Sequence, residues 1–265
     1  SLLRLGGEKR GISSFFSDVA GFTSISEKLS HEDLVNLLNE YLSEMTDIIL
    51  SHGGTLDKYE GDAIIAFWNA PLDQSDHAFK ACQAALLCQK RLEDLTPDLI
   101  KRYGRRLAMR IGINSGEAVV GNMGSKSRFD YTAMGDTVNL ASRLEGACKQ
   151  YNIPILVGET TFQEIKDVFV SREVDLIRVV GREKPARVYE IIGDKDAVSI
   201  NELEKIEIFH NALRAYRHQQ WEKALGLFES LEGDELAKLY IKRAQQLKNC
   251  RLPEYWSGVY DLKEK

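Results

Sequence analysis

Cysteine is scarce in this chain of 265 residues, and its placement argues against two kinds of site. The four cysteines are Cys82, Cys88, Cys148 and Cys250, which form no Cys-X-X-Cys pair and have no histidine at zinc-ligand spacing. Neither a structural zinc site nor a disulfide framework is therefore indicated. A chain without disulfides fits a reducing compartment, so we expect a cytoplasmic location.

Blocks of like charge and long apolar runs are also missing. The formal net charge is −5, with acidic and basic residues interspersed along the chain. Nucleic acid and anionic membrane surfaces are thus disfavoured as partners. No apolar run approaches the length that spans a bilayer, and the first residues do not resemble a signal peptide. If the natural protein has a membrane anchor, we expect it outside this chain.

The length of the chain predicts one large domain and an appendage. We expect residues 1–10 to be a polar lead-in, residues 11–193 to form the main domain, and residues 199–265 to be helical. In this helical tail, the apolar pattern predicts two amphipathic helices broken near Gln219, at a spacing similar to one tetratricopeptide unit. One such unit cannot form a solenoid, so we expect a helical cap, with Trp256 anchoring its end.

Hydrophobic periodicity predicts an α+β main domain. Ser30 and Asp33 form a capping box that begins a long amphipathic helix, and Gly53 ends this helix. The same patterns predict strands at 12–19, 62–68, 107–116, 129–134, 154–157, 168–178 and 186–192, helices at 75–102 and 159–166, and a turn within 116–124. Because hairpins are interspersed with helices, we expect a ferredoxin-like or palm-type sheet, mostly antiparallel, with helices packed on it.

Two of the predicted strands carry an acid at one end. Asp18 lies at the end of the first strand, and Asp62 opens the apolar strand that leaves the turn at Gly61. If these strands pair, the two carboxylates lie side by side and repel unless they are protonated or bridged by metal. Oxygen ligands without nearby His or Cys select Mg²⁺ or Mn²⁺, and a pair of such ions assists phosphoryl or nucleotidyl transfer. The alternative is an ion pair between Lys58 and Asp62 on a simple hairpin.

Two further segments carry groups suited to a nucleotide. Asn139 and Arg143 are four residues apart on a predicted helix, so they share one face. Arg143 would supply charge for a phosphoryl transition state, and Asn139 a hydrogen bond to a sugar. The turn at Phe22 and Thr23 has backbone N–H groups that could face an anion. Each residue alone is also typical of a solvated surface, and their joint occurrence indicates a site.

Three segments resemble the catalytic motifs of class III nucleotidyl cyclases. They are residues 16–23 (FSDVAGFT), 57–63 (DKYEGDA) and 129–145 (FDYTAMGDTVNLASRLE). The resemblance runs from about residue 8 to residue 193, with the motifs in the family's order and spacing. It implies a homodimer or pseudo-dimer with active sites at the subunit interface, which forms a cyclic nucleotide and pyrophosphate.

Carried over residue by residue, the resemblance implies that Asp18, Asp62 and the backbone carbonyl of Val19 hold two Mg²⁺ or Mn²⁺ ions. It implies that Lys58 and Thr132 of the other subunit read the base. Adenine offers a ring acceptor to the lysine ammonium and an amino donor to the threonine hydroxyl, whereas guanine reverses that pattern. The implied substrate is therefore ATP, and the implied product is cyclic AMP.

The resemblance also implies that Asn139 and Arg143 orient the ribose and stabilise the phosphates. In having Thr132 rather than an aspartate, the chain resembles a subgroup that often responds to bicarbonate. One departure is Val180, which stands where family members commonly have a lysine that contacts the triphosphate. Either Arg182 or Lys184 substitutes for that lysine, or the affinity for ATP is lower.

Three other functions are weighed against an adenylate cyclase. A guanylate cyclase is disfavoured by Lys58 and Thr132, and a catalytically weak regulatory or dimerisation module is disfavoured because neither acid nor the arginine is missing. A diguanylate cyclase would need a Gly-Gly-acid-acid-Phe turn, which this sequence lacks. The chain is also similar to the cytosolic module of bacterial cyclases that carry an upstream sensor and membrane region.

Overall fold

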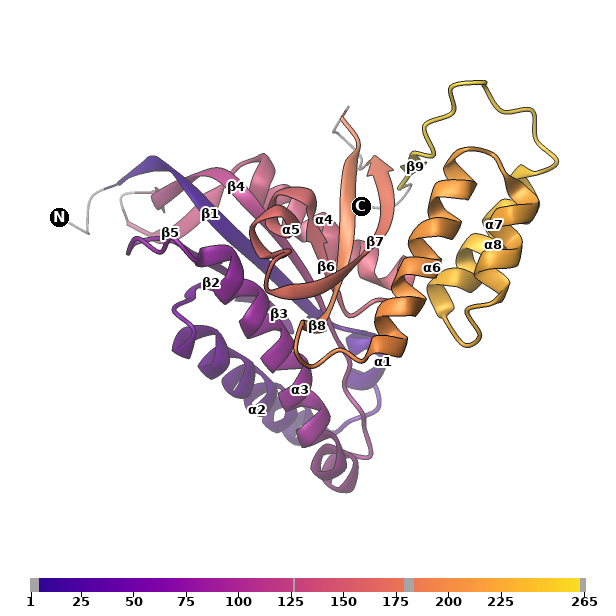
Figure 1. Ribbon diagram of the computed structural model, residues 1–265. Helices are drawn as coiled ribbons and strands as arrows, with labels where there is room; N and C mark the ends of the chain where they lie inside the picture. Colours follow the sequence, from indigo (N-terminus) through magenta and orange to yellow (C-terminus); the bar gives the residue numbers. More distant parts are fainter. Residues whose placement is uncertain (1–4, 126, 179–183, 263–265) are drawn as a thin grey trace.

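The computed structural model describes residues 5–125, 127–178 and 184–262, and its centre is a nine-stranded sheet (Figure 1). The strand order is β2-β3-β1-β4-β6-β8-β7-β9, and β5 pairs with β4 outside this path. The described pairings are antiparallel, except that β4 with β6 and β7 with β9 are parallel. The predicted α+β class with a mostly antiparallel sheet is confirmed, and the two parallel pairings make the sheet a mixed one.

Strands and helices alternate through most of the chain. The strands are β1 (Gly6–Val19), β2 (Thr55–Glu60), β3 (Ala63–Trp68), β4 (Met109–Gly124), β5 (Phe129–Met134), β6 (Ile155–Gly158), β7 (Phe169–Arg178), β8 (Ala186–Asp194) and β9 (Tyr260–Asp261). The helices are α1 (Phe22–Ser26), α2 (His31–Ser51), α3 (His77–Tyr103), α4 (Asp136–Tyr151), α5 (Glu159–Ile165), α6 (Ile200–Arg217), α7 (Trp221–Glu229) and α8 (Glu235–Leu247). Among these described helices, none has the length and apolar character that crossing a membrane requires.

Helices cover both faces of the sheet. On one face, α2 and α3 pack on β1 and β3 through a core that includes Phe15, Leu37 and Ile64. On the other face, α4 shares a second core with β6, β7, β8 and the tail helices α6, α7 and α8. This second core joins Leu144 of α4 to Phe209 of α6. The tail, at the right of Figure 1, therefore packs into the same core as the helix that carries the predicted Asn139 and Arg143.

Two strands are longer than the sequence predicted. β1 begins at Gly6 rather than at Ile12, because β4 continues to supply ladder partners as far as Asn122. The described part of the expected lead-in is thus mostly strand. The turn expected within 116–124 is wrong, since Gly116 pairs with Ile12 inside an unbroken ladder. An apolar pattern interrupted by glycines was mistaken for a turn, although glycine is compatible with a strand that another backbone approaches closely.

The tail has three described helices rather than the predicted two. The side chain of Ser199 caps α6, at the start of the predicted helical tail, and Gln219 adopts a left-handed φ of 58° between α6 and α7. A short turn then leads to α8, which packs on α7. Trp256 packs against Tyr216 and Trp221, and β9 pairs with β7. The expected anchoring of the tail by Trp256 is therefore confirmed.

Candidate active site

The adjoining ends of β1 and β3 bring the two predicted acids together. Antiparallel pairing places Ser17 of β1 opposite Ile64 of β3, so Asp18 and Asp62 extend from adjacent strand ends. The Oδ2 atom of Asp62 accepts a hydrogen bond of 2.9 Å from the backbone N–H of Val19. The sequence predicted this juxtaposition, and the register of the two strands produces it.

Arg110 and Glu145 complete the acidic cluster. Arg110 Nη2 lies 3.2 Å from Asp18 Oδ2, and Arg110 Nε lies 3.5 Å from Glu145 Oε1. Burial raises the pKa of Asp18 above its usual range, Arg110 lowers it, and the neighbouring Asp62 raises it again. Burial, followed by the charge of Asp18, raises the pKa of Glu145 to about 7. Sequence reasoning missed both Arg110 and Glu145 as members of the site, although Glu145 ends the third motif.

This cluster carries more negative than positive charge. In the described structure, Asp18 and Glu145 share the guanidinium of Arg110, whereas Asp62 accepts a hydrogen bond from the backbone of Val19, so negative charge remains in excess when the acids are ionised. The carboxylates and the carbonyl of Val19 are oxygen donors, which hard divalent cations prefer. The residues present therefore fit Mg²⁺ or Mn²⁺. Within the described ranges, no group of three or more His, Cys, Asp and Glu side chains is arranged to hold an ion alone.

A second cluster joins the two predicted base-reading residues through Asp57. The hydroxyl of Thr132 in β5 donates a hydrogen bond of 2.5 Å to Asp57 Oδ2. Lys58 Nζ lies 3.3 Å from Asp57 Oδ1, an ion-pair contact rather than an aligned hydrogen bond. The ion pair formed by Lys58 is thus with Asp57, and the Lys58–Asp62 pair weighed from the sequence does not occur. Asp57 was quoted within a motif but was not recognised as a site residue.

Helix α4 carries the remaining predicted catalytic residues. Asn139 is exposed and Arg143 is half-buried, one helical turn apart. In the described part of the chain, Arg143 has no carboxylate partner, so its guanidinium is available to an anion. The helix packs directly on β4 at Gly112, where an added Cβ would come within 2.3 Å of the backbone oxygen of Ala141.

The other predicted contacts are less well defined. Phe22 in the short helix α1 packs against the first core, whereas Thr23 is exposed. Val180 and Arg182, which bear on the missing triphosphate-contacting lysine, lie outside the described residues. Lys184 is described and exposed.

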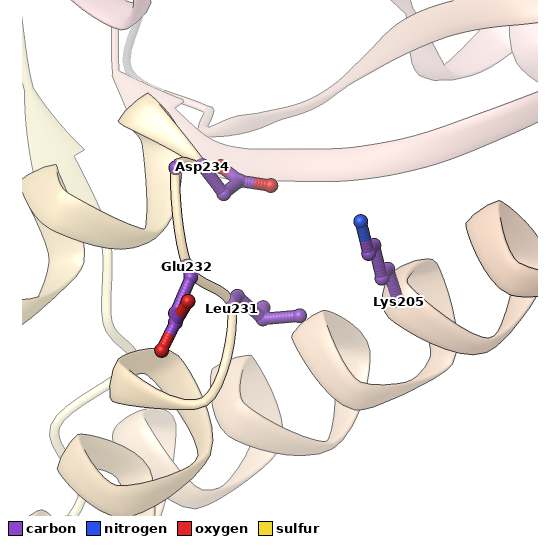
Figure 2. A pocket seen from close by; sticks show the side chains of 5 residues that line it. Lys205, Leu231, Glu232 and Asp234 are labelled. Atoms are coloured by element: carbon purple, nitrogen blue, oxygen red, sulfur yellow. The ribbon is translucent and has the colours of Figure 1, made fainter.

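A hollow of about 250 Å³ lies in the tail, away from the acidic cluster. Its lining residues are Lys205, Leu231, Glu232, Gly233 and Asp234. Figure 2 shows Lys205 and Asp234 extending toward the same space from different elements. Asp234 already forms an ion pair with Arg172 and caps α8. The hollow therefore contains a satisfied carboxylate and has no feature that indicates a nucleotide site.

The fold of the described residues is that of nucleotidyl cyclase catalytic domains. The family model of the adenylate and guanylate cyclase catalytic domain matches residues 7–193. The chain belongs to this family, so the resemblance stated from the sequence motifs is confirmed.

Curated relatives extend the match beyond single motifs. Adenylate cyclase 1 of Rhizobium meliloti (strain 1021) is 37% identical over 194 residues, which are 73% of this chain and 29% of that protein. The terminal-differentiation specific adenylate cyclase of Dictyostelium discoideum is 33% identical over 257 residues, 92% of this chain and 12% of that protein. The second match includes most of the helical tail. The chain spans less than a third of either relative's length.

Solved structures include both kinds of cyclase. The adenylyl cyclase CyaB from P. aeruginosa is similar with a TM-score of 0.68 and 36% identity, over 74% of this chain and 100% of that chain. The guanylyl cyclase Cya2 is similar with a TM-score of 0.65 and 35% identity, over 74% of this chain and 98% of that chain. Overall similarity therefore does not separate the two substrates, which must be distinguished by residues that face the base.

Proposed function

We propose that this chain is the catalytic part of an adenylate cyclase, which converts ATP to 3′,5′-cyclic AMP and pyrophosphate. The proposal rests on one observation: a single chain carries both an oxygen-rich acidic cluster at Asp18 and Asp62 and a linked pair, Lys58 and Thr132, suited to adenine. The adenylate cyclases among its relatives support the same substrate. We further propose that it acts in the cytoplasm, as one module of a longer protein.

In the proposed reaction, the ribose 3′-oxygen forms a bond to the α-phosphorus, the hydroxyl proton passes to solvent, and the bond to the pyrophosphate leaving group breaks. Lys58 donates a hydrogen bond to the adenine ring nitrogen, and Thr132 accepts one from the amino group. Asn139 orients the ribose, and Arg143 stabilises charge on the phosphates. Two Mg²⁺ or Mn²⁺ ions held by Asp18, Asp62 and the carbonyl of Val19 would make the attacking oxygen more nucleophilic and neutralise the triphosphate.

We propose that two copies of the chain form a homodimer with two equivalent active sites. Each site would take its acids from one copy and Lys58, Thr132, Asn139 and Arg143 from the other. Apolar side chains on β4 and β5 support a protein interface there, since Val119 is 44% exposed and Met134 is 57% exposed. Exposed apolar groups on neighbouring strands are typical of surfaces that another protein covers.

Guanylate cyclase activity is the second candidate, because Cya2 is almost as similar to this chain as CyaB. A guanine base presents a ring N–H where adenine presents an acceptor, so the ammonium of Lys58 would meet a donor. This mismatch favours ATP. The same residues argue against a catalytically weak module, since the acids, the lysine and the arginine are all present.

The test is steady-state turnover of ATP and GTP with Mg²⁺ or Mn²⁺, measured over a range of protein concentrations. Replacing Asp62 with Asn retains an acceptor for the N–H of Val19 but removes the charge. We expect Asp62→Asn to lower cyclic AMP formation at least about 100-fold, because a negatively charged metal ligand is lost. The matched control is Asp47→Asn on the exposed side of α2. Equal rates for the two variants would contradict the metal assignment, and formation of cyclic GMP alone would contradict the substrate.

A further inference from the structure

Asp57 contacts both residues that are proposed to read the base. Its side chain is only 4% exposed, so a substrate cannot touch it directly. Its two oxygens are divided between two neighbours: Oδ2 accepts the hydroxyl hydrogen of Thr132 at 2.5 Å, and Oδ1 lies 3.3 Å from Lys58 Nζ. A buried carboxylate with these two contacts couples β2 to β5 within one chain.

A bulge in β2 accounts for the position of Asp57. The register of β2 against β3 shifts between Leu56, which pairs with Ala66, and Lys58, which pairs with Ile65. Asp57 is therefore the extra residue, without a ladder partner on β3. In a regular strand, neighbouring side chains point to opposite faces, whereas a bulge redirects a side chain and is common beside active sites. The bulge allows the carboxylate of Asp57 to reach both the following lysine and the neighbouring strand.

The contact with Asp57 fixes the hydrogen-bonding role of Thr132. A hydroxyl has one hydrogen to donate and two lone pairs that accept. An ionised carboxylate only accepts, and a bond from a hydroxyl to a carboxylate is short and strong. The hydrogen of Thr132 is therefore committed to Asp57, and the oxygen can only accept from a base. The C6 amino group of adenine donates to such an oxygen, whereas the C6 carbonyl oxygen of guanine cannot.

We propose that Asp57 is a specificity-determining positioning residue, which selects adenine by orienting the hydroxyl of Thr132 and holding the ammonium of Lys58. This inference rests on the proposed adenylate cyclase function and names a residue that acts through others. The selection is built into each chain before a nucleotide binds. An unoriented hydroxyl would adapt to either base by rotating, because its hydrogen position is free.

The test compares kcat/KM for ATP and GTP in the whole chain. In Asp57→Asn, the amide oxygen is attracted to Lys58, and the amide NH₂ group then donates to Thr132. The hydroxyl hydrogen of Thr132 is released toward the base. We expect the ratio of kcat/KM for ATP to that for GTP to fall by about tenfold, the effect of losing one hydrogen bond of this kind. Thr132→Val should lower the ratio similarly, and Thr132→Ser should retain it.

The double variant Asp57→Asn with Thr132→Val separates positioning from general damage. If Asp57 acts through the hydroxyl, the double variant should lower the ratio little more than Thr132→Val alone. If the two substitutions instead lower the ratio by factors that multiply, Asp57 does not act through the hydroxyl of Thr132, and the proposal is wrong. Thermal unfolding of each variant checks folding, Asp47→Asn is the control, and Asp57→Ser replaces Asp57→Asn if the latter unfolds.

The outcome for Asp57 can be distinguished from the outcome for the proposed function. Turnover of ATP by the unaltered chain tests the function alone. An unchanged ATP-to-GTP ratio in folded Asp57→Asn, together with a lowered ratio in Thr132→Val, would reject the role of Asp57 and leave the function standing. Competition between ATP and GTP for equilibrium binding gives the same comparison if turnover is absent.

Discussion

At the scale of single residues, Gly112 sets how closely helix α4 approaches the sheet. A Cβ atom at this position would lie 2.2 Å from the backbone nitrogen of Glu145 and 2.3 Å from the backbone oxygen of Ala141. Both atoms belong to the main chain of α4, which cannot move aside as the tip of a flexible side chain can. The absence of a side chain at Gly112 therefore positions the helix that carries Asn139 and Arg143.

We predict that Gly112→Ala destabilises the protein and displaces α4. Overpacking of this kind typically costs about 1–3 kcal/mol, and contact with backbone atoms places this variant at the upper end. Urea unfolding measures the loss of stability, and kcat should fall because Asn139 and Arg143 move with the helix. Gly146→Ala in the same helix is the matched control, because its Cβ would meet no atom within 4 Å. That control should gain about 0.5–1 kcal/mol from the better helix propensity of alanine. If Gly112→Ala loses no more stability than a typical surface variant, α4 does not pack closely against Gly112.

Candidate site residues that lie in recognisable sequence motifs could be predicted from the sequence alone. Residues that reach the site only through a bulge or through strand pairing were missed. Asp18 and Asp62 were identified because each lies where a predicted strand meets a turn. Asp57 was missed because a bulge, which no hydrophobic pattern reports, redirects its side chain toward Thr132. Arg110 was missed because it lies inside a predicted strand, and only the pairing of β1 with β4 brings it opposite Asp18.

At the scale of elements, a buried ion pair links the tail to the end of helix α4. Asp175 of β7 is 1% exposed and accepts hydrogen bonds from the hydroxyl of Tyr151 at 2.8 Å and from Arg243 Nη1 at 2.7 Å. Tyr151 ends α4, and Arg243 belongs to α8. The guanidinium of Arg243 also lies 3.7 Å from the ring centre of Tyr260 in β9. Three tail and sheet elements thus meet at the end of the helix that carries Asn139.

We predict that Arg243→Met costs about 3–5 kcal/mol of stability, because it leaves the carboxylate of Asp175 buried without its cation. Adding Asp175→Asn should recover part of this loss, since the second change removes the unpaired charge. The control is Arg214→Met, which removes an ion pair between residues that are each 65% exposed and should cost less than about 1 kcal/mol. Chemical denaturation of the three variants measures these differences. Equal costs for Arg243→Met and Arg214→Met would show that the buried pair does not hold the tail.

The ends of helices and strands were predicted correctly where the sequence carries a strong local signal. The capping box at Ser30 and the glycine at 53 placed α2 correctly, because the hydroxyl of Ser30 does accept a hydrogen bond from the N–H of Asp33. The extent of β4 was not predictable from local pattern, because its second half is held by long-range pairing with β1 and β5. The third tail helix, α8, was not predicted, although its buried residues Leu236, Tyr240 and Ala244 recur at helical spacing and pack in the same core as α6 and α7.

At the scale of the whole molecule, the two halves of the proposed site occupy separate places on one chain. The acids lie where β1 meets β3, and the pair of Lys58 and Thr132 lies between β2 and β5. The fold of one chain thus forms both halves, but in separate places. A two-fold symmetric dimer would bring the acids of one copy next to Lys58 and Thr132 of the other. The proposed dimer could not be predicted from residue patterns within one chain. It was inferred from the family resemblance alone.

A mixing experiment tests this division between copies. We predict that Asp62→Asn and Arg143→Ala are each nearly inactive alone but regain about a quarter of the unaltered activity when mixed in equal amounts, because random pairing makes half the dimers mixed and gives each mixed dimer one intact site. The matched control mixes Asp62→Asn with Asp18→Asn. Both of these changes affect the acidic half, so every site in a mixed dimer keeps one defect and activity should stay low. Recovery is measured as cyclic AMP formation after the variants are incubated together at a concentration at which the unaltered chain is dimeric by gel filtration. If mixed dimers form and the first mixture stays as inactive as the control, each site is made by one chain, and the proposed exchange of half-sites is wrong.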